Sequence, residues 1–363
     1  MRKIIFLIIV ALIGYLVFIS LKSKDDTSVR TTRETKNSEI SNNKSNSEKA
    51  TTISSKSVFV PYWTASNLNS NELVNYDRIM YFGVAATEQG IDRSESGFSG
   101  LPEFIQNTDR KNRLLTLRML DTESNLKILA DSKIQEKIIY DLISIVDEYG
   151  FDGVVLDLEL SVLPYADVKE NISMFVRVFG QKLRERDLEL AMTIYGDTYF
   201  RGRPYDIQEL NKFVDEFMIM AYDFHKSYGE PGPNFPLGGR ITYGYDFKKM
   251  IEDFSDDVES EKLTVVFGMF GYDWTLGKQG KPLKRGEALT LSQIRERFYP
   301  NCDLKSCLTK KDPESAETKI TYIDDEGYRH VVWFDDDDSV EEKIEYLKSK
   351  GIGSVAYWAY GYY

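Results

Sequence analysis

Apolar, β-branched runs recur along the chain from about residue 57 to the C-terminus, with turn residues or helical patterns between them. Short apolar runs bounded by turn signals are typical of buried strands. Eight such runs predict eight strands, at Val58–Tyr62, Arg78–Val84, Arg113–Met119, Gly153–Leu158, Glu189–Tyr195, Glu216–Tyr222, Leu263–Met269 and Ser354–Tyr360. Their alternation with helices favours an α/β protein.

Three stretches between these runs carry apolar residues at the spacing of one helix face. Ser132 and Gln135 form a capping-box pattern before the first, and Gly150 is its stop. The second stripe runs over residues 168–183, and Ser339 is the predicted cap of the third. We assign these stripes to packing against the strands.

Eight strands in alternation with helices predict a (β/α)8 TIM barrel, whose active site lies at the C-terminal ends of the strands. The span from Trp274 to Trp333 is too long for a barrel loop. It contains a helical pattern at Leu291–Phe298 and a hairpin-like segment at 319–334. We interpret residues 275–333 as a small α+β insertion between the seventh strand and the last helix.

Two carboxylates mark the end of the fourth predicted strand. Side chains alternate between the two faces of a strand, so Val155, Asp157 and Glu159 project to one side. Buried strands rarely carry two acids on one face unless the acids are paired or do chemistry, and residues 151–163 contain no Lys or Arg. The alternative without a functional role is that Asp157 and Glu159 form an acidic strand end that runs into a solvated loop.

The N-terminus predicts a membrane anchor. Arg2 and Lys3 precede an apolar stretch from Ile4 to Leu21. At ~1.5 Å per residue it can just cross the ~30 Å hydrocarbon layer, and the basic start favours a cytoplasmic N-terminus. No small-x-small cleavage site follows, so we expect an uncleaved signal anchor over residues 1–21; cleavage would instead give a secreted protein.

The next segment predicts a tether. Residues 22–56 are rich in Lys, Ser, Thr, Asn, Asp and Glu, a composition that buries too little apolar surface to fold. The barrel domain then spans residues 57–363. The expected location is the cell surface, with the barrel outside and the anchor in the membrane.

Composition excludes some partners. The net charge of −12 argues against nucleic acid as a ligand. The two cysteines, Cys302 and Cys307, are close enough in sequence to close a small disulfide loop, which the sequence leaves open. With only two histidines in the chain, His225 and His330, a zinc site is improbable, and we expect neither metal nor cofactor. We interpret the run Asp335–Asp338 as a solvated face, because it lacks the spacing of a calcium loop.

Several motifs together resemble family 18 of the glycoside hydrolases, the chitinase-like barrels. The fourth-strand signature of that family, Asp-Gly-x-Asp-x-Asp-x-Glu, is matched at Asp152, Gly153, Asp157 and Glu159, while Val155 replaces the second acid. The sixth strand ends in Met-Ala-Tyr-Asp at 220–223, and the eighth in Ala-Tyr-Trp at 356–358, both similar to family motifs.

The resemblance is stronger for the bacterial branch of spore-cortex and cell-wall N-acetylglucosaminidases. The segments 270–274, 288–290 and 330–335 are similar to that branch, and the resemblance runs from Pro61-Tyr62-Trp63 to the C-terminus. It implies a monomeric enzyme that acts on a polysaccharide containing N-acetylglucosamine, either peptidoglycan or chitin. No LysM repeat is found.

The resemblance also implies roles for single residues. Family members use the acetamide oxygen of the substrate as nucleophile, outside the usual scheme of two carboxylates. Glu159 is then expected to be the general acid and later the base, Asp157 to hold the acetamide N–H, and Tyr222 to bind the acetamide carbonyl. Further substrate contacts are expected from Asp223, Trp358, Tyr62, Tyr272 and Trp274. The alternatives without a functional role are that Tyr222 is an ordinary barrel tyrosine and that Trp358 is an ordinary core tryptophan.

Two classes of function follow. The first is a retaining hydrolase that cuts β-1,4 N-acetylglucosaminyl bonds in peptidoglycan, with a chitinase or an endo-β-N-acetylglucosaminidase as the alternative at the level of substrate. The second is a lectin-like barrel that binds carbohydrate without cleaving it. The usual mark of the second class is loss of the catalytic glutamate, and Glu159 is present. Val155 removes a like charge beside Asp157, which favours the ionised form of that carboxyl.

Overall fold

All eight predicted strands form, and they close into one parallel barrel in the computed structural model, which describes residues 52–108 and 112–363. The order around the barrel is β1-β14-β8-β7-β6-β5-β4-β2, and β1 pairs with β2 to close it. The barrel strands are β1 (Ser55–Pro61), β2 (Arg78–Thr87), β4 (Asn112–Met119), β5 (Gly153–Leu158), β6 (Glu189–Tyr195), β7 (Glu216–Ala221), β8 (Leu263–Gly268) and β14 (Ser354–Trp358).

Strand β1 begins at Ser55, so the barrel starts earlier in the chain than residue 57, inside the predicted tether. The expected anchor over residues 1–21, and the tether except its last five residues, lie outside the described residues. Within residues 52–108 and 112–363, no helix combines the length and the apolar character that a membrane crossing requires.

The barrel interior is a layer of apolar side chains to which every barrel strand contributes. Its members are Phe59, Met80, Phe82, Leu114, Val155, Ala191, Met218, Val266 and Ala356. Val155 therefore fills the barrel just below Asp157. Its neighbours Val154 and Leu156 point the opposite way, into the larger core between strands and helices. The predicted alternation of faces along this strand is confirmed.

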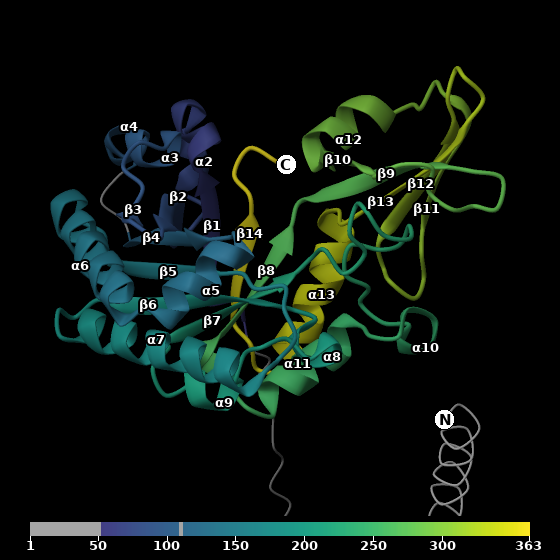
Figure 1. Cartoon of the computed structure of the whole chain (residues 1–363). Helices are drawn as coiled ribbons and strands as arrows, with labels where there is room; N and C mark the ends of the chain where they lie inside the picture. The colour runs from purple at the N-terminus through teal and green to yellow at the C-terminus, as the bar shows by residue number, and fades with distance from the viewer. Residues whose placement is uncertain (1–51, 109–111) are drawn as a thin grey trace, which may run out of the picture. The chain divides into compact units, whose positions relative to one another are not determined.

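Helices and short turns cover the outside of the barrel (Figure 1). The connections after β1 and β2 hold η1 (Tyr62–Asn67), α2 (Ser70–Leu73), β3 (Gly90–Ile91), α3 (Ser96–Ser99) and α4 (Leu101–Asn107). The later connections hold α5 (Thr122–Ala130), α6 (Ser132–Tyr149), α7 (Ala166–Arg184), α8 (Thr198–Arg201), α9 (Ile207–Leu210), α10 (Arg240–Tyr243), α11 (Phe247–Ser255), η2 (Ser260–Lys262) and α13 (Asp337–Ser349).

The predicted cap of α6 is wrong by one residue. Asp131 is the N-cap, and its carboxylate accepts hydrogen bonds from the backbone N–H groups of Lys133 and Ile134. Gln135 does not close a capping box; its side-chain amide donates to the carbonyls of Ile128 and Leu129, at the end of α5. Aspartate is as good an N-cap as serine, so the earlier residue takes the position.

The insertion is a five-stranded antiparallel sheet in the order β10-β9-β13-β12-β11, with one helix. Its elements are β9 (Phe270–Leu276), β10 (Glu287–Thr290), α12 (Leu291–Phe298), β11 (Lys305–Lys311), β12 (Thr318–Ile323) and β13 (Arg329–Phe334). It begins at residue 270, earlier than the predicted 275, because the chain leaves β8 and enters β9 almost at once. Cys302 and Cys307 form a disulfide within it.

A buried ion cluster joins the insertion to the last barrel helix. Asp335, Glu317 and Lys343 are each 0% exposed. The Lys343 ammonium donates to Asp335 at 2.6 Å and to Glu317 at 3.1 Å. Asp335 is thus not part of a solvated face, and the prediction for this run is wrong at its first residue. Asp336, not Ser339, is the N-cap of α13, and Ser339 completes a capping box with it.

Replacing Lys343 by Met should destabilise the protein strongly, because it leaves two carboxylates buried without their cation. Breaking a buried ion pair in this way typically costs about 3–5 kcal/mol. Lys348→Met on the same helix is the matched control: its partner Glu345 lies at the surface, so the loss should be at most about 1 kcal/mol. Urea titration gives the free energy of unfolding of each variant, and equal losses would contradict a structural role for the cluster.

Candidate active site

Asp157 lies inside the barrel mouth, in the layer above Val155. It is 3% exposed, and the Thr193 hydroxyl on β6 donates to its carboxylate at 2.5 Å. Arg118 stands beside it in register on β4. Burial and the nearby Glu159 raise the pKa of Asp157 to about 8, against the opposing effects of Thr193 and Arg118. Although Val155 adds no charge here, this carboxyl therefore holds a proton more readily than a free one.

Glu159 follows the end of β5 and is half-buried at the barrel mouth. The Tyr195 hydroxyl, at the end of β6, donates to its carboxylate at 2.5 Å. Its backbone is held from β4 and α5, because its N–H donates to the Met119 carbonyl at 2.9 Å and its carbonyl accepts from the Asn125 amide at 3.0 Å. These bonds fix the side chain in a direction that the strand alone would not determine.

Tyr205 secures the same segment from the other side. Its hydroxyl donates to the Leu158 carbonyl at 2.7 Å and accepts from the Leu160 N–H at 3.1 Å. The residues before and after Glu159 are thus tied to one phenol that is itself buried. The general position of the carboxylate is therefore set by backbone bonds and not by a flexible loop.

Tyr222 lies across the barrel mouth, directly after β7, and packs on the barrel interior and on Phe270. Burial and the negative charges of Asp157 and Glu159 raise the pKa of its phenol, so the hydroxyl remains a hydrogen-bond donor. Gly268 leaves room for it, since a Cβ there would lie 2.7 Å from the Tyr222 Cβ. Tyr222, Asp157 and Glu159 thus converge on one space.

Asp223 is held in a left-handed backbone conformation, with φ of 59°. Its N–H donates to the Asn234 side-chain oxygen at 2.8 Å, and the Tyr272 hydroxyl donates to its carboxylate at 2.6 Å. The backbone N–H of Asn234 in turn donates to Glu317 of the buried ion cluster at 2.6 Å. The insertion therefore supports Asp223 through both Tyr272 and Asn234.

Trp358 ends β14 and forms an aromatic group with Phe59, Phe82 and Trp63, at ring distances of 5.7, 4.6 and 6.4 Å. It is half-buried, so part of the indole faces outward. Tyr62 lies near, with the Arg118 guanidinium 5.2 Å from its ring centre. Tyr62 at the start of η1 and Trp358 at the end of β14, both predicted sugar contacts, thus share one wall of the mouth.

Trp274 does not share that exposure. It is 0% exposed, and its indole N–H donates to the Ser227 carbonyl at 3.2 Å. Tyr272 packs on it, at a ring distance of 5.5 Å. This packing leaves Trp274 no free face for a sugar, so we place it in the wall behind Tyr272 and correct the expected contact.

Sequence reasoning missed several residues of this site. Thr193 and Tyr195 follow Ala191 at intervals of two residues along β6, so all three project to the same face of the strand. Ala191 lies in the barrel interior, so the inward face of β6 could be predicted from this pattern. Asn234 and Tyr205 lie in connections, and no periodic signal marks them. Within the described part of the chain, no group of three or more His, Cys, Asp or Glu residues has the arrangement of a metal site.

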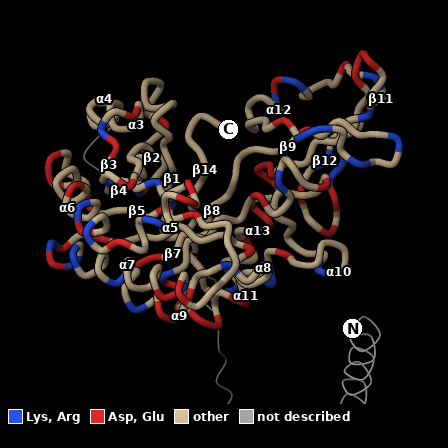
Figure 2. Tube along the Cα trace, viewed as in Figure 1, with Lys and Arg blue, Asp and Glu red and all other residues tan. Residues whose placement is uncertain are grey.

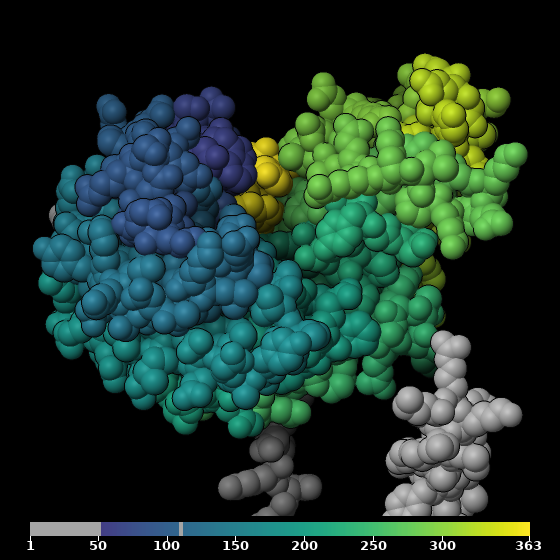
Figure 3. All heavy atoms as spheres, in the orientation of Figure 1, coloured from purple at the N-terminus to yellow at the C-terminus, as the bar shows by residue number. Residues whose placement is uncertain are grey.

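The surface is hollowed beside these residues. Figure 3 shows a groove between the N-terminal residues drawn in purple and blue and the insertion drawn in green, with C-terminal residues drawn in yellow at its floor. Its walls therefore come from the segments that carry Tyr62 and Tyr272. An extended chain of sugars is a ligand of suitable shape for such a groove.

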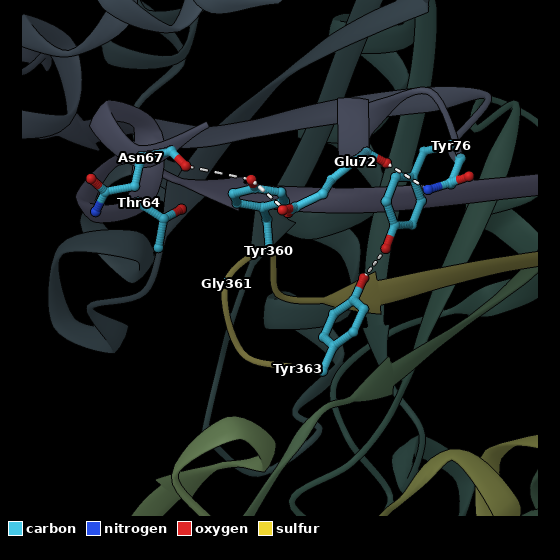
Figure 4. Close-up of a pocket in the computed structure, with 8 residues that line it drawn as sticks. Thr64, Asn67, Glu72, Tyr76, Tyr360, Gly361 and Tyr363 are labelled. Atoms are coloured by element: carbon cyan, nitrogen blue, oxygen red, sulfur yellow. Dashed lines mark hydrogen bonds between the residues drawn. The ribbon is translucent and has the colours of Figure 1, made fainter. Parts of the chain in front are cut away.

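A separate cavity of about 540 Å³ lies between the segment after β1 and the C-terminal residues. It is lined by Thr64, Asn67, Glu72, Asn75, Tyr76, Tyr360, Gly361 and Tyr363. Figure 4 shows the Tyr360 hydroxyl bonded to Glu72 and to the Asn67 carbonyl, and the hydroxyls of Tyr76 and Tyr363 bonded to each other. Its phenols are thus already satisfied and no catalytic carboxylate reaches it, so we assign the chemistry to the barrel mouth.

The sequence model of the family described as "Glycosyl hydrolases family 18" matches residues 119–362. The cortical fragment-lytic enzyme of Bacillus anthracis is 27% identical over 242 residues, which cover 64% of this chain and 52% of that relative. The chain thus spans about half the length of this curated relative.

Solved structures share the fold. The spore cortex-lytic enzyme SleL of Bacillus cereus superposes with a TM-score of 0.68 at 20% identity, covering 86% of this chain and 72% of that one. The class V chitinase of Nicotiana tobaccum gives a TM-score of 0.71 at 17% identity, covering 84% and 93%. At these identities the likeness establishes the barrel and not the substrate.

Proposed function

The chain belongs to family 18 of the glycosyl hydrolases, and on that premise we propose that it hydrolyses β-1,4 N-acetylglucosaminyl bonds with retention, using the substrate's acetamide as nucleophile. The observation that carries the proposal is the convergence of Asp157, Glu159 and Tyr222 on one space at the C-terminal ends of β5 and β7, where barrel enzymes carry their catalytic groups.

In this mechanism Glu159 protonates the leaving oxygen and afterwards removes a proton from water. Burial and the charge of Glu159 raise the pKa of Asp157 to about 8, so this carboxyl holds a proton at neutral pH before substrate binds. The positive charge that develops on the sugar then favours the ionised form of Asp157. Tyr195, bonded to Glu159, sets the direction of the acid.

The acetamide needs partners on both its polar atoms. Asp157 accepts from the acetamide N–H and balances the positive charge that develops as the ring closes, and the Tyr222 hydroxyl donates to the acetamide oxygen. Trp358 supplies the apolar floor for the pyranose. Asp223, fixed by Tyr272 and Asn234, contacts the sugar or supports Glu159.

Peptidoglycan is the proposed substrate. The names of the cortical fragment-lytic and spore cortex-lytic relatives support a wall glycan. Chitin is the neutral alternative, because a class V chitinase has the same barrel fold. A purely carbohydrate-binding role would leave Glu159 and its bonds to Tyr195 and Asn125 without use.

Mass spectrometry of soluble products tests this proposal. Digestion of purified wall by the full chain should release muropeptides with N-acetylglucosamine at the reducing end. Products that end in muramic acid, or release from chitin but not from wall, would overturn the assigned bond or the assigned substrate. Heat-inactivated protein is the control for spontaneous release.

We also propose that the barrel faces outside the cell on a membrane anchor, since Arg2 and Lys3 precede the apolar stretch to Leu21. Protease treatment of intact protoplasts should then release a fragment close to the barrel domain in size, while a cytoplasmic marker stays intact. Full-length protein that survives this treatment, but is cut after lysis, would contradict the orientation.

A further inference from the structure

Two cations flank the active site without a carboxylate partner of their own. Lys226 follows β7 by a few residues, and Arg285 lies in the loop between β9 and β10. Among the ion pairs of the described residues, neither side chain takes part in one. A hydrogen bond from Nε holds Arg285, and the Lys226 ammonium lies over an aromatic ring, which suggests a role other than general solubility.

Ser227 is the anchor that brings them together. Its carbonyl accepts from the Gly286 N–H at 2.6 Å and from the Trp274 indole at 3.2 Å. Its hydroxyl accepts from the Arg285 Nε at 2.8 Å. The loop of the insertion is therefore bonded to the loop of the barrel. Within residues 52–108 and 112–363, the two terminal nitrogens of Arg285 make no hydrogen bond or ion pair.

Lys226 lies over Tyr195, the tyrosine that is hydrogen-bonded to Glu159. Its ammonium lies 5.5 Å from the ring centre of Tyr195, whose hydroxyl donates to Glu159. Burial raises the pKa of Asp223, while the bond from Tyr272 and the charges of Lys226 and Arg285 act to lower it. Both cations are thus close enough to the site to act on its carboxylates.

The loop that carries Arg285 is basic throughout. Residues 277–286 include Lys278, Lys281, Lys284 and Arg285 and no Asp or Glu, in a chain whose net charge is −12. Figure 2 shows this basic stretch in blue after β9. A neutral glycan would gain no electrostatic attraction from such charges. An anionic glycan is repelled by Asp157, Glu159 and Asp223 at the barrel mouth, and nearby cations would offset that repulsion.

We propose that Lys226 and Arg285 form a carboxylate-binding subsite beside the cleaved bond, which selects N-acetylated glycans that carry carboxylates over neutral ones. This inference rests on the proposed function, and it deepens that function by naming the charged group that the site recognises. The carboxylate belongs either to the lactyl group of muramic acid or to a stem peptide. Both present the same acceptor to an ammonium and a guanidinium.

Binding to the Glu159→Gln protein tests the subsite without hydrolysis. The probes are peptide-free glycan strands of alternating N-acetylglucosamine and N-acetylmuramic acid, the same strands methyl-esterified, peptide-bearing strands, and a neutral chito-oligosaccharide of equal length. We expect the free acid to bind more tightly than its ester. Lys226→Gln should reduce affinity for the acid about threefold and Lys226→Gln with Arg285→Gln about tenfold, as for partly exposed charge pairs.

Affinity for the two neutral probes, the methyl ester and the chito-oligosaccharide, should be unaffected by these changes. Lys182→Gln on the exposed surface of α7 is the matched control, and it should leave affinity for every probe unaltered. The difference between acid and ester should vanish in about 1 M salt, where the Debye length is about 3 Å. If the peptide-free acid binds more tightly than its ester, the lactyl group is the source of the carboxylate. If these two bind alike and only peptide-bearing strands lose affinity when Lys226 and Arg285 are both changed, the stem peptide is the source.

Equal affinity for the acid and its ester, together with unaltered binding of peptide-bearing strands when Lys226 and Arg285 are both changed, would overturn the subsite. A loss that is the same for charged and neutral probes would also overturn it. Neither result bears on hydrolysis, which is measured separately with the unmodified chain. Failure to cleave any N-acetylated glycan would sink the proposed function, whereas the charge dependence of binding would stand.

Discussion

Glu159→Gln should lower the rate of hydrolysis by about 10²–10⁴-fold, the usual contribution of a general acid and base. Glutamine keeps the size of the side chain and can still accept the hydrogen bond that Tyr195 makes to Glu159. It cannot donate a proton to the leaving oxygen or take one from water. The loss should therefore fall on kcat, while affinity for glycan is largely kept.

Glu148→Gln is a suitable control, because that residue lies exposed on α6 away from the barrel mouth. Its rate should match the unmodified protein. Thermal unfolding of both variants excludes a folding defect as the cause. Unchanged turnover in Glu159→Gln would show that another group is the acid, and would leave Glu159 as an acidic residue where the strand runs into a solvated loop.

Removal of the substrate's N-acetyl group should abolish cleavage, since the acetamide oxygen is the proposed nucleophile. Glycans de-N-acetylated at the cleaved residue are then essentially inert even where they bind. Asp157→Asn should also lose most activity, because an amide does not supply the charge that balances the developing ring cation. A thiazoline that mimics the cyclised acetamide should inhibit competitively.

Thr193 makes Asp157→Asn an informative change. Its hydroxyl now donates to the Asp157 carboxylate, and it can also donate to an asparagine oxygen, so the local packing is preserved. A de-N-acetylated glycan cut at the normal rate, or a glycosyl ester trapped on Asp157 or Glu159, would contradict the use of the acetamide.

Much of the barrel could be predicted because its strands are short apolar runs with fixed alternation. Asp157 projects to the same side as Val155, and the structure places both inside the barrel. The limits of the strands shifted by a few residues, as at Ser55 and Phe270, since pairing with neighbouring strands decides where a ladder ends. The start of the insertion was harder to predict, because its first strand, β9, begins only two residues after β8 ends.

Contacts that depend on tertiary structure could not be predicted. Asn234 reaches Asp223 and Glu317 only after the insertion has packed against β7. Asp335 looked like a surface charge because its partner Lys343 lies on the next helix, and pairing of that kind leaves no local pattern. Trp274 belonged to a family-like motif, yet its burial against Ser227 removes it from the substrate surface.

The configuration of the first-formed product tests the central claim most directly. Proton NMR recorded within the first turnovers of an N-acetylated glycan, before mutarotation, reports the anomer released at the cleaved bond. Double displacement through the acetamide predicts that the β anomer appears first and the α anomer only later. Initial release of the α anomer would mean direct attack by water and would contradict the mechanism assigned to Asp157, Glu159 and Tyr222.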